Sequence, residues 1–260
     1  MAALDDAPAQ HRLLAPGDPA PVEVVNAASA APVLLLCEHA GRAVPAALAG
    51  LGVSGAVLSS HRGWDIGAEA VARGVAAKLG APLVIQRYSR LVIDANRPPG
   101  SAQSILETSD GEAVPGNRGL SEAARRARVA EIFEPMDRAI VAAFERAPRR
   151  AAFSIHSFTP TLGGAARPWR AGFLSRRDVA TAQALMAAVR AALPGLTLAL
   201  NEPYRIEDET DWFIPAHAEP RGLAHALIEI RNDQIDDAAG AALWVDLLAD
   251  AISAVLRIDR

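Results

Sequence analysis

Cysteine, aromatic residues and long basic runs are scarce in this sequence, and each shortage excludes a class of protein. The 260 residues include one cysteine, Cys37, so the chain can form no internal disulfide and no cysteine-rich zinc site. The formal net charge is −4 and no long basic run occurs, so nothing in the composition indicates a nucleic-acid partner. Aromatic residues are 5% of the chain whereas alanine is abundant, which favours helices packed closely on a sheet.

We expect no export signal at the start of this sequence. Its first residues are acidic, without the basic and apolar regions of a signal peptide. We expect no apolar run to approach the roughly 20 residues that cross a bilayer. We therefore expect a cytoplasmic protein without a membrane partner, and we find no signal for a particular oligomeric state.

Apolar segments typical of strands alternate with amphipathic segments typical of helices, which predicts an α/β fold. We predict a single-domain mixed, mostly parallel sheet flanked by helices on both faces over residues 31–260, after an irregular N-terminal lead-in over residues 1–30. The predicted strands are 32–38, 82–86, 91–94, 151–155, 171–174, 197–200 and 223–230. The predicted helices are 66–79, 121–147 with a kink at Pro135, 179–193 and 237–256.

Polar residues lie at the carboxyl ends of several of these strands, where open α/β sheets bind ligands. They are Glu38 and His39, then Asp94, Asn96 and Arg97, then His156 and Ser157, and finally Glu229 and Arg231. Asp65 stands at the start of a predicted helix. We expect these groups to face a common site.

Each candidate also has a purely structural interpretation. A single histidine after a strand, such as His156, is often a satisfied structural residue, and Asp65 suits the N-cap of the helix that follows. Glu229 and Arg231 lie on the same strand face and could form an ion pair. A nucleotide-binding protein is disfavoured, because no glycine-rich phosphate loop follows any strand.

The residue types at the strand ends suit metal-assisted hydrolysis. Two histidines and a carboxylate from separate elements are typical of catalytic zinc sites with one position open for water. Glu229 lies in an otherwise apolar strand, and burial raises the pKa of a carboxyl group toward the range of a general base. Arg97 beside Asn96 could hold a substrate carboxylate through two parallel hydrogen bonds.

Five stretches between residues 30 and 258 carry a family likeness. They are Cys37-Glu-His-Ala-Gly41 with Val44-Pro45, Trp64-Asp-Ile-Gly-Ala68, Tyr88-Ser-Arg-Leu-Val-Ile-Asp-Ala-Asn-Arg-Pro98, Ile155-His-Ser-Phe-Thr-Pro160 and His225-Ala-Leu-Ile-Glu-Ile-Arg-Asn-Asp233. In these stretches the sequence resembles the N-formylglutamate amidohydrolase family.

Parts of the same stretches are distantly similar to zinc carboxypeptidases, which implies a zinc-exopeptidase-like fold. The segments that carry this likeness are Val92-Ile-Asp-Ala-Asn-Arg97, Ser154-Ile-His-Ser157 and Ile228-Glu-Ile-Arg231. The likeness implies that His156 binds zinc and that Glu229 is the general base. It also implies that Asn96 and Arg97 grip a carboxylate of the substrate.

The sequence departs from these patterns in two places. Carboxypeptidases have a glutamate three residues after the first ligand histidine, whereas Arg42 follows His39 at that spacing. We choose Asp65, in the matched Trp-Asp stretch, as the acidic ligand, with Glu38 and His61 as alternatives. Family members that act in histidine breakdown have a Pro-His-Ser-Gly form where this chain has Glu-His-Ala-Gly, so the zinc chemistry transfers better than the substrate.

The resemblance therefore implies a zinc-dependent amidohydrolase that cleaves the N-acyl bond of a small acidic N-acylamino acid, N-formyl-L-glutamate by family likeness. The implied zinc ligands are His39, Asp65 and His156. Glu229 would activate water, Arg90 or His217 would stabilise the oxyanion, and Ser157 is a further substrate-binding candidate. The alternatives are a zinc carboxypeptidase or deacylase of the same fold with a different acyl or peptide substrate, and a non-catalytic binding protein on this scaffold.

Overall fold

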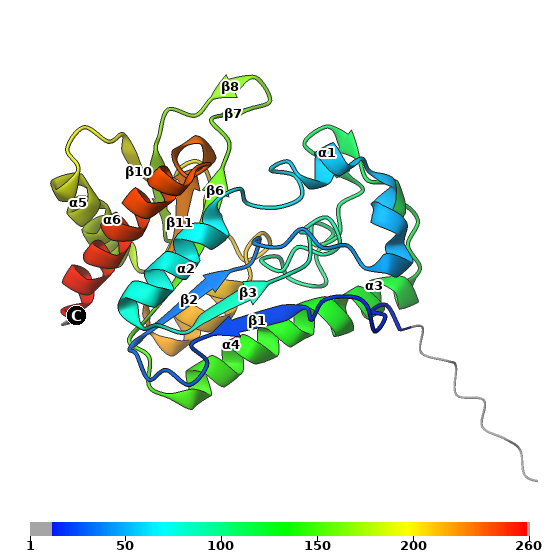
Figure 1. The fold of residues 1–260 in the computed structure, drawn as a ribbon, viewed down its shortest axis with the longest axis horizontal. Helices are drawn as coiled ribbons and strands as arrows, with labels where there is room; N and C mark the ends of the chain where they lie inside the picture. The colour runs from blue at the N-terminus through cyan, green and yellow to red at the C-terminus, as the bar shows by residue number, and fades with distance from the viewer. Residues whose placement is uncertain (1–11, 259–260) are drawn as a thin grey trace, which may run out of the picture.

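Seven strands form one sheet in the computed structural model, which describes residues 12–258 (Figure 1). In sheet order they are β1 (Val22–Val25), β3 (Leu83–Gln86), β2 (Val33–Cys37), β6 (Ala151–Phe158), β11 (Ala224–Arg231), β9 (Ala171–Leu174) and β10 (Leu198–Leu200). The pairs β3–β2, β2–β6, β6–β11 and β9–β10 are parallel, whereas β1–β3 and β11–β9 are antiparallel. The predicted mixed, mostly parallel sheet is confirmed.

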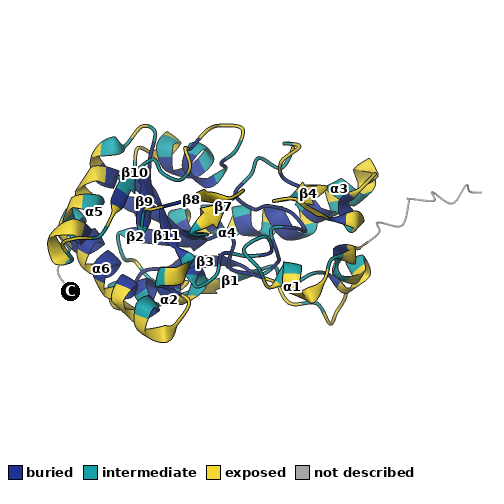
Figure 2. Ribbon diagram, turned by 90° about the horizontal axis from the view of Figure 1, so that it is seen from above, coloured by how far each residue is buried: buried dark blue, intermediate teal, exposed yellow. Residues whose placement is uncertain are grey.

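Helices cover both faces of the sheet, as predicted. Helices α2 (Ala68–Leu79), α5 (Val179–Ala192) and α6 (Ala238–Leu256) pack on one face, and α4 (Glu134–Arg146) packs on the other (Figure 1). Successive strand residues point to opposite faces, so Leu35 joins the core beneath α2 and α6 while Leu34 joins the core beneath α4. The continuous apolar run of β2 therefore reflects burial on both faces of the sheet. In Figure 2 the central strands are buried, whereas the outer surfaces of the helices are exposed.

Shorter elements connect these layers. They are α1 (Gly55–Leu58), α3 (Glu122–Arg128), the hairpins β4 (Thr108–Ser109) with β5 (Glu112–Ala113) and β7 (Thr161–Leu162) with β8 (Ala165–Ala166), and short 3₁₀- or π-helical segments at Ala46–Gly52, Pro115–Asn117, Val129–Phe133, Ile214–Ala218, Glu219–Arg221 and Asn232–Gln234. The predicted helix 121–147 is α3 and α4 joined by a π-helical turn that ends two residues before Pro135. Pro135 has no N–H to donate, and a wider turn directly before it accommodates that loss.

Two strand-level predictions are wrong. Residues 91–94 are irregular: the Val92 N–H donates to the Ser89 carbonyl in a turn, and the Asp94 N–H donates to the Ser104 carbonyl. Their apolar side chains are buried in a separate core cluster beside the sheet, which explains the apolar run without a strand. The segment 1–30, predicted to be irregular, contains β1 within its described part, paired with β3; residues 1–11 lie outside the described residues.

Helix α6 corrects the expectation that no apolar run approaches membrane-spanning length. By length and composition alone it could cross a bilayer, with a mean hydropathy of 1.7. In the structure Trp244, Leu248 and Ile252 are buried in the core that α6 shares with α2, α5 and the sheet. Its hydrophobicity is therefore explained by packing inside the protein.

Candidate active site

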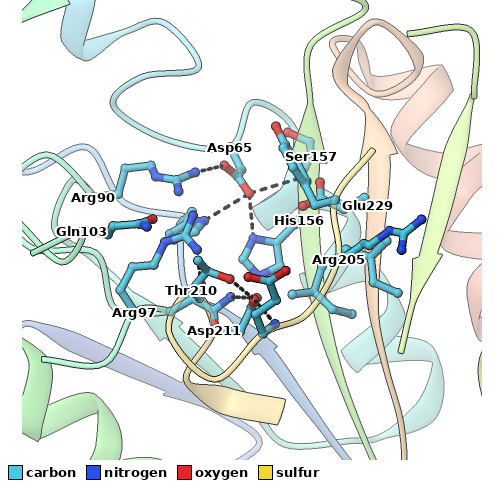
Figure 3. Close-up of a pocket in the computed structure, with 16 residues that line it drawn as sticks. Asp65, Arg90, Arg97, Gln103, His156, Ser157, Arg205, Thr210, Asp211 and Glu229 are labelled. Atoms are coloured by element: carbon cyan, nitrogen blue, oxygen red, sulfur yellow. Dashed lines mark hydrogen bonds and ion pairs between the residues drawn. The ribbon is translucent and has the colours of Figure 1, made fainter. Parts of the chain in front are cut away.

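Side chains from separate elements converge beyond the carboxyl ends of β2, β6 and β11, where they line a pocket of about 340 Å³ (Figure 3). His39 follows β2, and His156 lies near the end of β6. Glu229 is the register partner of His156 on the adjacent parallel strand β11. Asp65 enters from the segment before α2. His39, His156 and Glu229 therefore lie at one edge of the sheet, as expected, and Asp65 joins them there from the segment before α2.

His39, Asp65 and His156 are close enough to hold one metal ion, because their candidate ligand atoms all lie within 4.8 Å of one another. The Asp65 Oδ2 atom is 2.9 Å from His156 Nδ1 and 3.5 Å from His39 Nδ1. All three side chains are buried. Two imidazole nitrogens and one carboxylate oxygen match the donor set of a catalytic zinc site.

The surroundings of the two histidines also fit a metal. His39 Nε2 lies 2.6 Å from Asp94 Oδ1, and His156 Nε2 lies 3.2 Å from Glu38 Oε2. A carboxylate only accepts hydrogen bonds, so Asp94 favours a proton on His39 Nε2 and leaves the His39 Nδ1 lone pair for a metal. His39 Nδ1 is buried without a hydrogen-bond partner among the described residues, which is the state expected of a metal-ligating atom in a metal-free site.

The charges around these three residues also favour a bound cation. The carboxylates of Glu38, Asp65 and Asp94 are buried, whereas Arg90, which pairs with Asp65 and Asp94, is partly exposed. Burial opposes a charged imidazole, but Glu38 and Asp65 outweigh it and hold the pKa of His156 well above its usual value. The site thus recruits positive charge, and a divalent cation would supply it.

The two alternatives to Asp65 as acidic ligand lie elsewhere. Glu38 is on the far side of the His156 ring from Asp65, since the two carboxylates contact opposite ring nitrogens. His61 is partly exposed, pairs with Asp110 at 3.0 Å and does not line the pocket. Of the three candidates, the geometry therefore favours Asp65.

Asp65 is not an N-cap. The residue that precedes α2 is Gly67, at φ +81°, and no side chain caps the helix. A Cβ atom at Gly67 would lie 2.2 Å from the Ile235 carbonyl oxygen, so this turn requires glycine. The tight turn directs Asp65 into the site, where its Oδ2 atom accepts a hydrogen bond from the Ser157 N–H at 3.1 Å.

Glu229 has the environment of a general base. It is 6% exposed, lines the pocket, and its Oε2 atom has no hydrogen-bond partner within residues 12–258. Burial raises the pKa of Glu229 to about 7, against the opposing charge of His156. The alternative ion pair with Arg231 is not formed, because that guanidinium binds Asp233 at 2.8 Å.

One wall of the pocket was not identified from the sequence. Tyr204 and Arg205 line it, in the segment that follows β10. Arg167 donates a hydrogen bond to the Tyr204 hydroxyl at 3.0 Å and lies over its ring. The stretch Asn201-Glu-Pro-Tyr204 at a strand end was the available signal, but its approach to Glu229 depends on pairing between β11 and β9.

The predicted substrate-binding residues divide between two roles. Arg97 lines the pocket and donates a hydrogen bond to the Thr210 carbonyl. Asn96 also borders the pocket, but its amide oxygen accepts from the Trp212 and Phe213 N–H groups, each at 3.2 Å. The Asn96 side chain therefore secures the segment 211–213 rather than presenting its oxygen to a ligand.

The two oxyanion candidates also separate. Arg90 lines the pocket, 2.7 Å from Asp94 and 3.4 Å from Asp65. His217 does not line it: its Nε2 atom is 2.7 Å from Asp137, and its ring stacks between Phe144 and Phe213. The structure therefore does not support His217 as an oxyanion residue, and Arg90 is the remaining candidate.

Ser157, the remaining substrate-binding candidate, borders the pocket. Its hydroxyl donates to the Ile66 carbonyl at 2.8 Å, which ties β6 to the segment that carries Asp65.

The chain is similar to known proteins in both sequence and fold. The family model described as N-formylglutamate amidohydrolase matches residues 31–235. The crystal structure of gene product Atu2144 from Agrobacterium tumefaciens has 39% sequence identity and a TM-score of 0.88, covering 95% of this chain and 98% of that chain. None of the curated protein sequences compared with this chain matches it significantly.

Two other solved structures align over most of this chain at low similarity. A bacteriophage poly-gamma-glutamate hydrolase has 11% identity and a TM-score of 0.46, covering 92% of this chain and 90% of that chain. A metallo-carboxypeptidase from Burkholderia cenocepacia has 16% identity and a TM-score of 0.39, covering 86% and 57%. Neither is similar enough to inform the site.

The family match spans most of the sequence, and the relative of 39% identity aligns over nearly the whole of both chains. The resemblance noted in the sequence motifs is thereby confirmed. The chain belongs to the N-formylglutamate amidohydrolase family, a family of hydrolases that act on amide bonds.

Proposed function

We propose that this protein is a zinc-dependent amidohydrolase that cleaves the N-acyl bond of a small acidic N-acylamino acid, with N-formyl-L-glutamate as the first substrate to test. One observation carries the proposal: His39, Asp65 and His156 converge in the same pocket as the unpaired Glu229 carboxylate. This combination serves metal-assisted hydrolysis and has no evident purpose in a binding protein. We expect the enzyme to act in the cytoplasm on a small molecule.

The chemistry divides between the metal and the protein. Zinc held by these three residues would supply Lewis-acid activation of water and of the substrate carbonyl. Glu229 accepts the proton of the attacking water at its free Oε2 atom and passes it to the leaving amine. A pKa of about 7 lets one carboxyl group serve as base and then as acid near neutral pH. Arg90 faces the developing oxyanion.

The pocket suits a small anionic substrate. A volume of about 340 Å³ is at the small end of ligand sites, which favours a short acyl group and one amino acid over a peptide. Three arginines line it, Arg90, Arg97 and Arg205. Guanidinium groups bind carboxylates well, and N-formyl-L-glutamate carries two.

The test is formate release from N-formyl-L-glutamate by the purified protein, with added zinc and after chelation. We expect release that is lost on chelation and restored by zinc. N-formyl-L-aspartate and N-acetyl-L-glutamate probe the length of the acid side chain and the size of the acyl group. Zinc binding without formate release would redirect the proposal to another acyl group, and a protein that binds no zinc would contradict it.

A further inference from the structure

Glu38 is a buried carboxylate whose position the hydrolysis chemistry above does not explain. It is 1% exposed and does not line the pocket, so it cannot touch a substrate. It lies just beyond β2, where Leu36 is the register partner of Ser154 on β6. Glu38 and His156 each lie two residues further along their strands, which brings the carboxylate beside the imidazole.

The contacts of Glu38 point at one ring nitrogen. Its Oε2 atom lies 3.2 Å from His156 Nε2 and accepts a hydrogen bond from the Ser154 hydroxyl at 2.5 Å. The Ser154 contact fixes the carboxylate, and the carboxylate faces Nε2. His156 Nδ1, on the other side of the ring, lies 2.9 Å from Asp65. Glu38 thus stands directly behind a candidate ligand.

We propose that Glu38 is a positioning residue, which keeps the proton of His156 on Nε2 and aims the Nδ1 lone pair at the metal. Asp94 hydrogen-bonds His39 Nε2 at 2.6 Å, and Glu38 lies 3.2 Å from the corresponding atom of His156. A carboxylate behind a ligand histidine fixes its tautomer and ring orientation and increases its basicity, and loss of such a partner typically costs about 10–100-fold in metal affinity. The inference rests on the proposed metal site.

The experiment measures zinc affinity by competition with a chelating dye, in wild type and in Glu38→Gln. Gln keeps the shape of the side chain but carries no charge, and its amide N–H group can face Nε2 and select the wrong tautomer. We expect zinc to bind Glu38→Gln about 10–100-fold more weakly than wild type. The visible spectrum of the cobalt-substituted protein should change as well, because the His156 ligand loses its fixed orientation.

A matched control separates this role from general loss of a buried carboxylate. Glu219 is equally enclosed, with 2% of its side chain exposed, but it pairs with Arg176. Glu219→Gln should leave zinc affinity and the cobalt spectrum unchanged. Thermal unfolding of the metal-free proteins reports any purely structural effect of either change.

Three outcomes are decisive. Wild-type zinc affinity in a folded Glu38→Gln protein would overturn the role of Glu38. If that variant does not fold, Ser154→Ala removes the hydrogen bond that fixes Glu38, and unchanged affinity there would overturn it equally. A wild-type protein that binds no zinc would instead refute the proposed function, and the role of Glu38 with it.

Discussion

Gly172 and Glu229 are register partners on the antiparallel strands β9 and β11, and the backbone of Glu202 lies directly against Gly172. A Cβ atom at Gly172 would lie 1.6 Å from the carbonyl oxygen of Glu202. Only glycine therefore lets the segment 202–205 pass beside Glu229 and place Tyr204 and Arg205 in the pocket wall. The burial that sets the acidity of Glu229 depends on a residue from another strand.

Gly172→Ala should displace the segment 202–205, because the clash is with backbone. Glu229 would then be more exposed, and its pKa would fall from about 7 toward its ordinary value of 4.5. A base must be ionised to act, so the acid limb of the kcat/KM profile should move to lower pH while KM rises. Gly100→Ala, with open space around its Cβ, is the control, and an unmoved pH profile in Gly172→Ala would contradict the argument.

Glu229→Gln should abolish turnover and stabilise the metal-free protein in alkaline solution. The folded pKa of about 7 lies above the unfolded value of 4.5, so the carboxyl group is neutral in both states below pH 4.5. Above pH 7 it is ionised in both, and the folded state then bears a cost of about 3 kcal/mol that Gln avoids. Urea unfolding at pH 4 and pH 8 measures this, with the exposed Glu107→Gln as control. Equal stability of Glu229→Gln and wild type at pH 8 would refute the raised pKa.

Arg205→Ala should weaken substrate binding more than catalysis. Arg205 lines the pocket and forms no hydrogen bond or ion pair with any residue in 12–258, so its guanidinium is available to a carboxylate. A charged hydrogen bond contributes about 1.5–3 kcal/mol, so KM for N-formyl-L-glutamate should rise roughly ten-fold or more with little change in kcat. N-formyl-L-glutamine should be affected less if Arg205 reads the side-chain carboxylate. Arg177→Ala, outside the pocket, should change neither constant.

His217→Gln should leave catalysis intact but lower stability. His217 contacts Asp137 and stacks on Phe144 and Phe213, away from the pocket. Loss of the buried contact should cost on the order of 1–2 kcal/mol of the free energy of unfolding. We expect kcat within two-fold of wild type, which is about 0.4 kcal/mol in the barrier. A hundred-fold loss of kcat with retained folding would restore His217 as an oxyanion residue.

The sequence alone determined the α/β class and most strands and helices, and it pointed to His39, Asp65, His156 and Glu229 as candidate site residues. Those features are local: an apolar run buried on both faces or an amphipathic period is visible in a short window. His39, His156 and Glu229 each lie at the carboxyl end of a predicted parallel strand, and this was enough to place the three residues at one edge of the sheet.

Only the tertiary structure decided where each of those residues lies relative to the pocket. Asp65 and Glu38 are both carboxylates near a histidine, and only the packing of β2 beside β6 shows that one faces the pocket and the other stands behind the ring. The same holds for His217, which is close in sequence to the pocket residue Asp211 yet faces α4. The apolar run 91–94 suited a strand as well as a buried turn, because its burial comes from distant partners. Contacts between residues far apart in the chain have no local pattern, and they set the orientation and burial of the groups in this site.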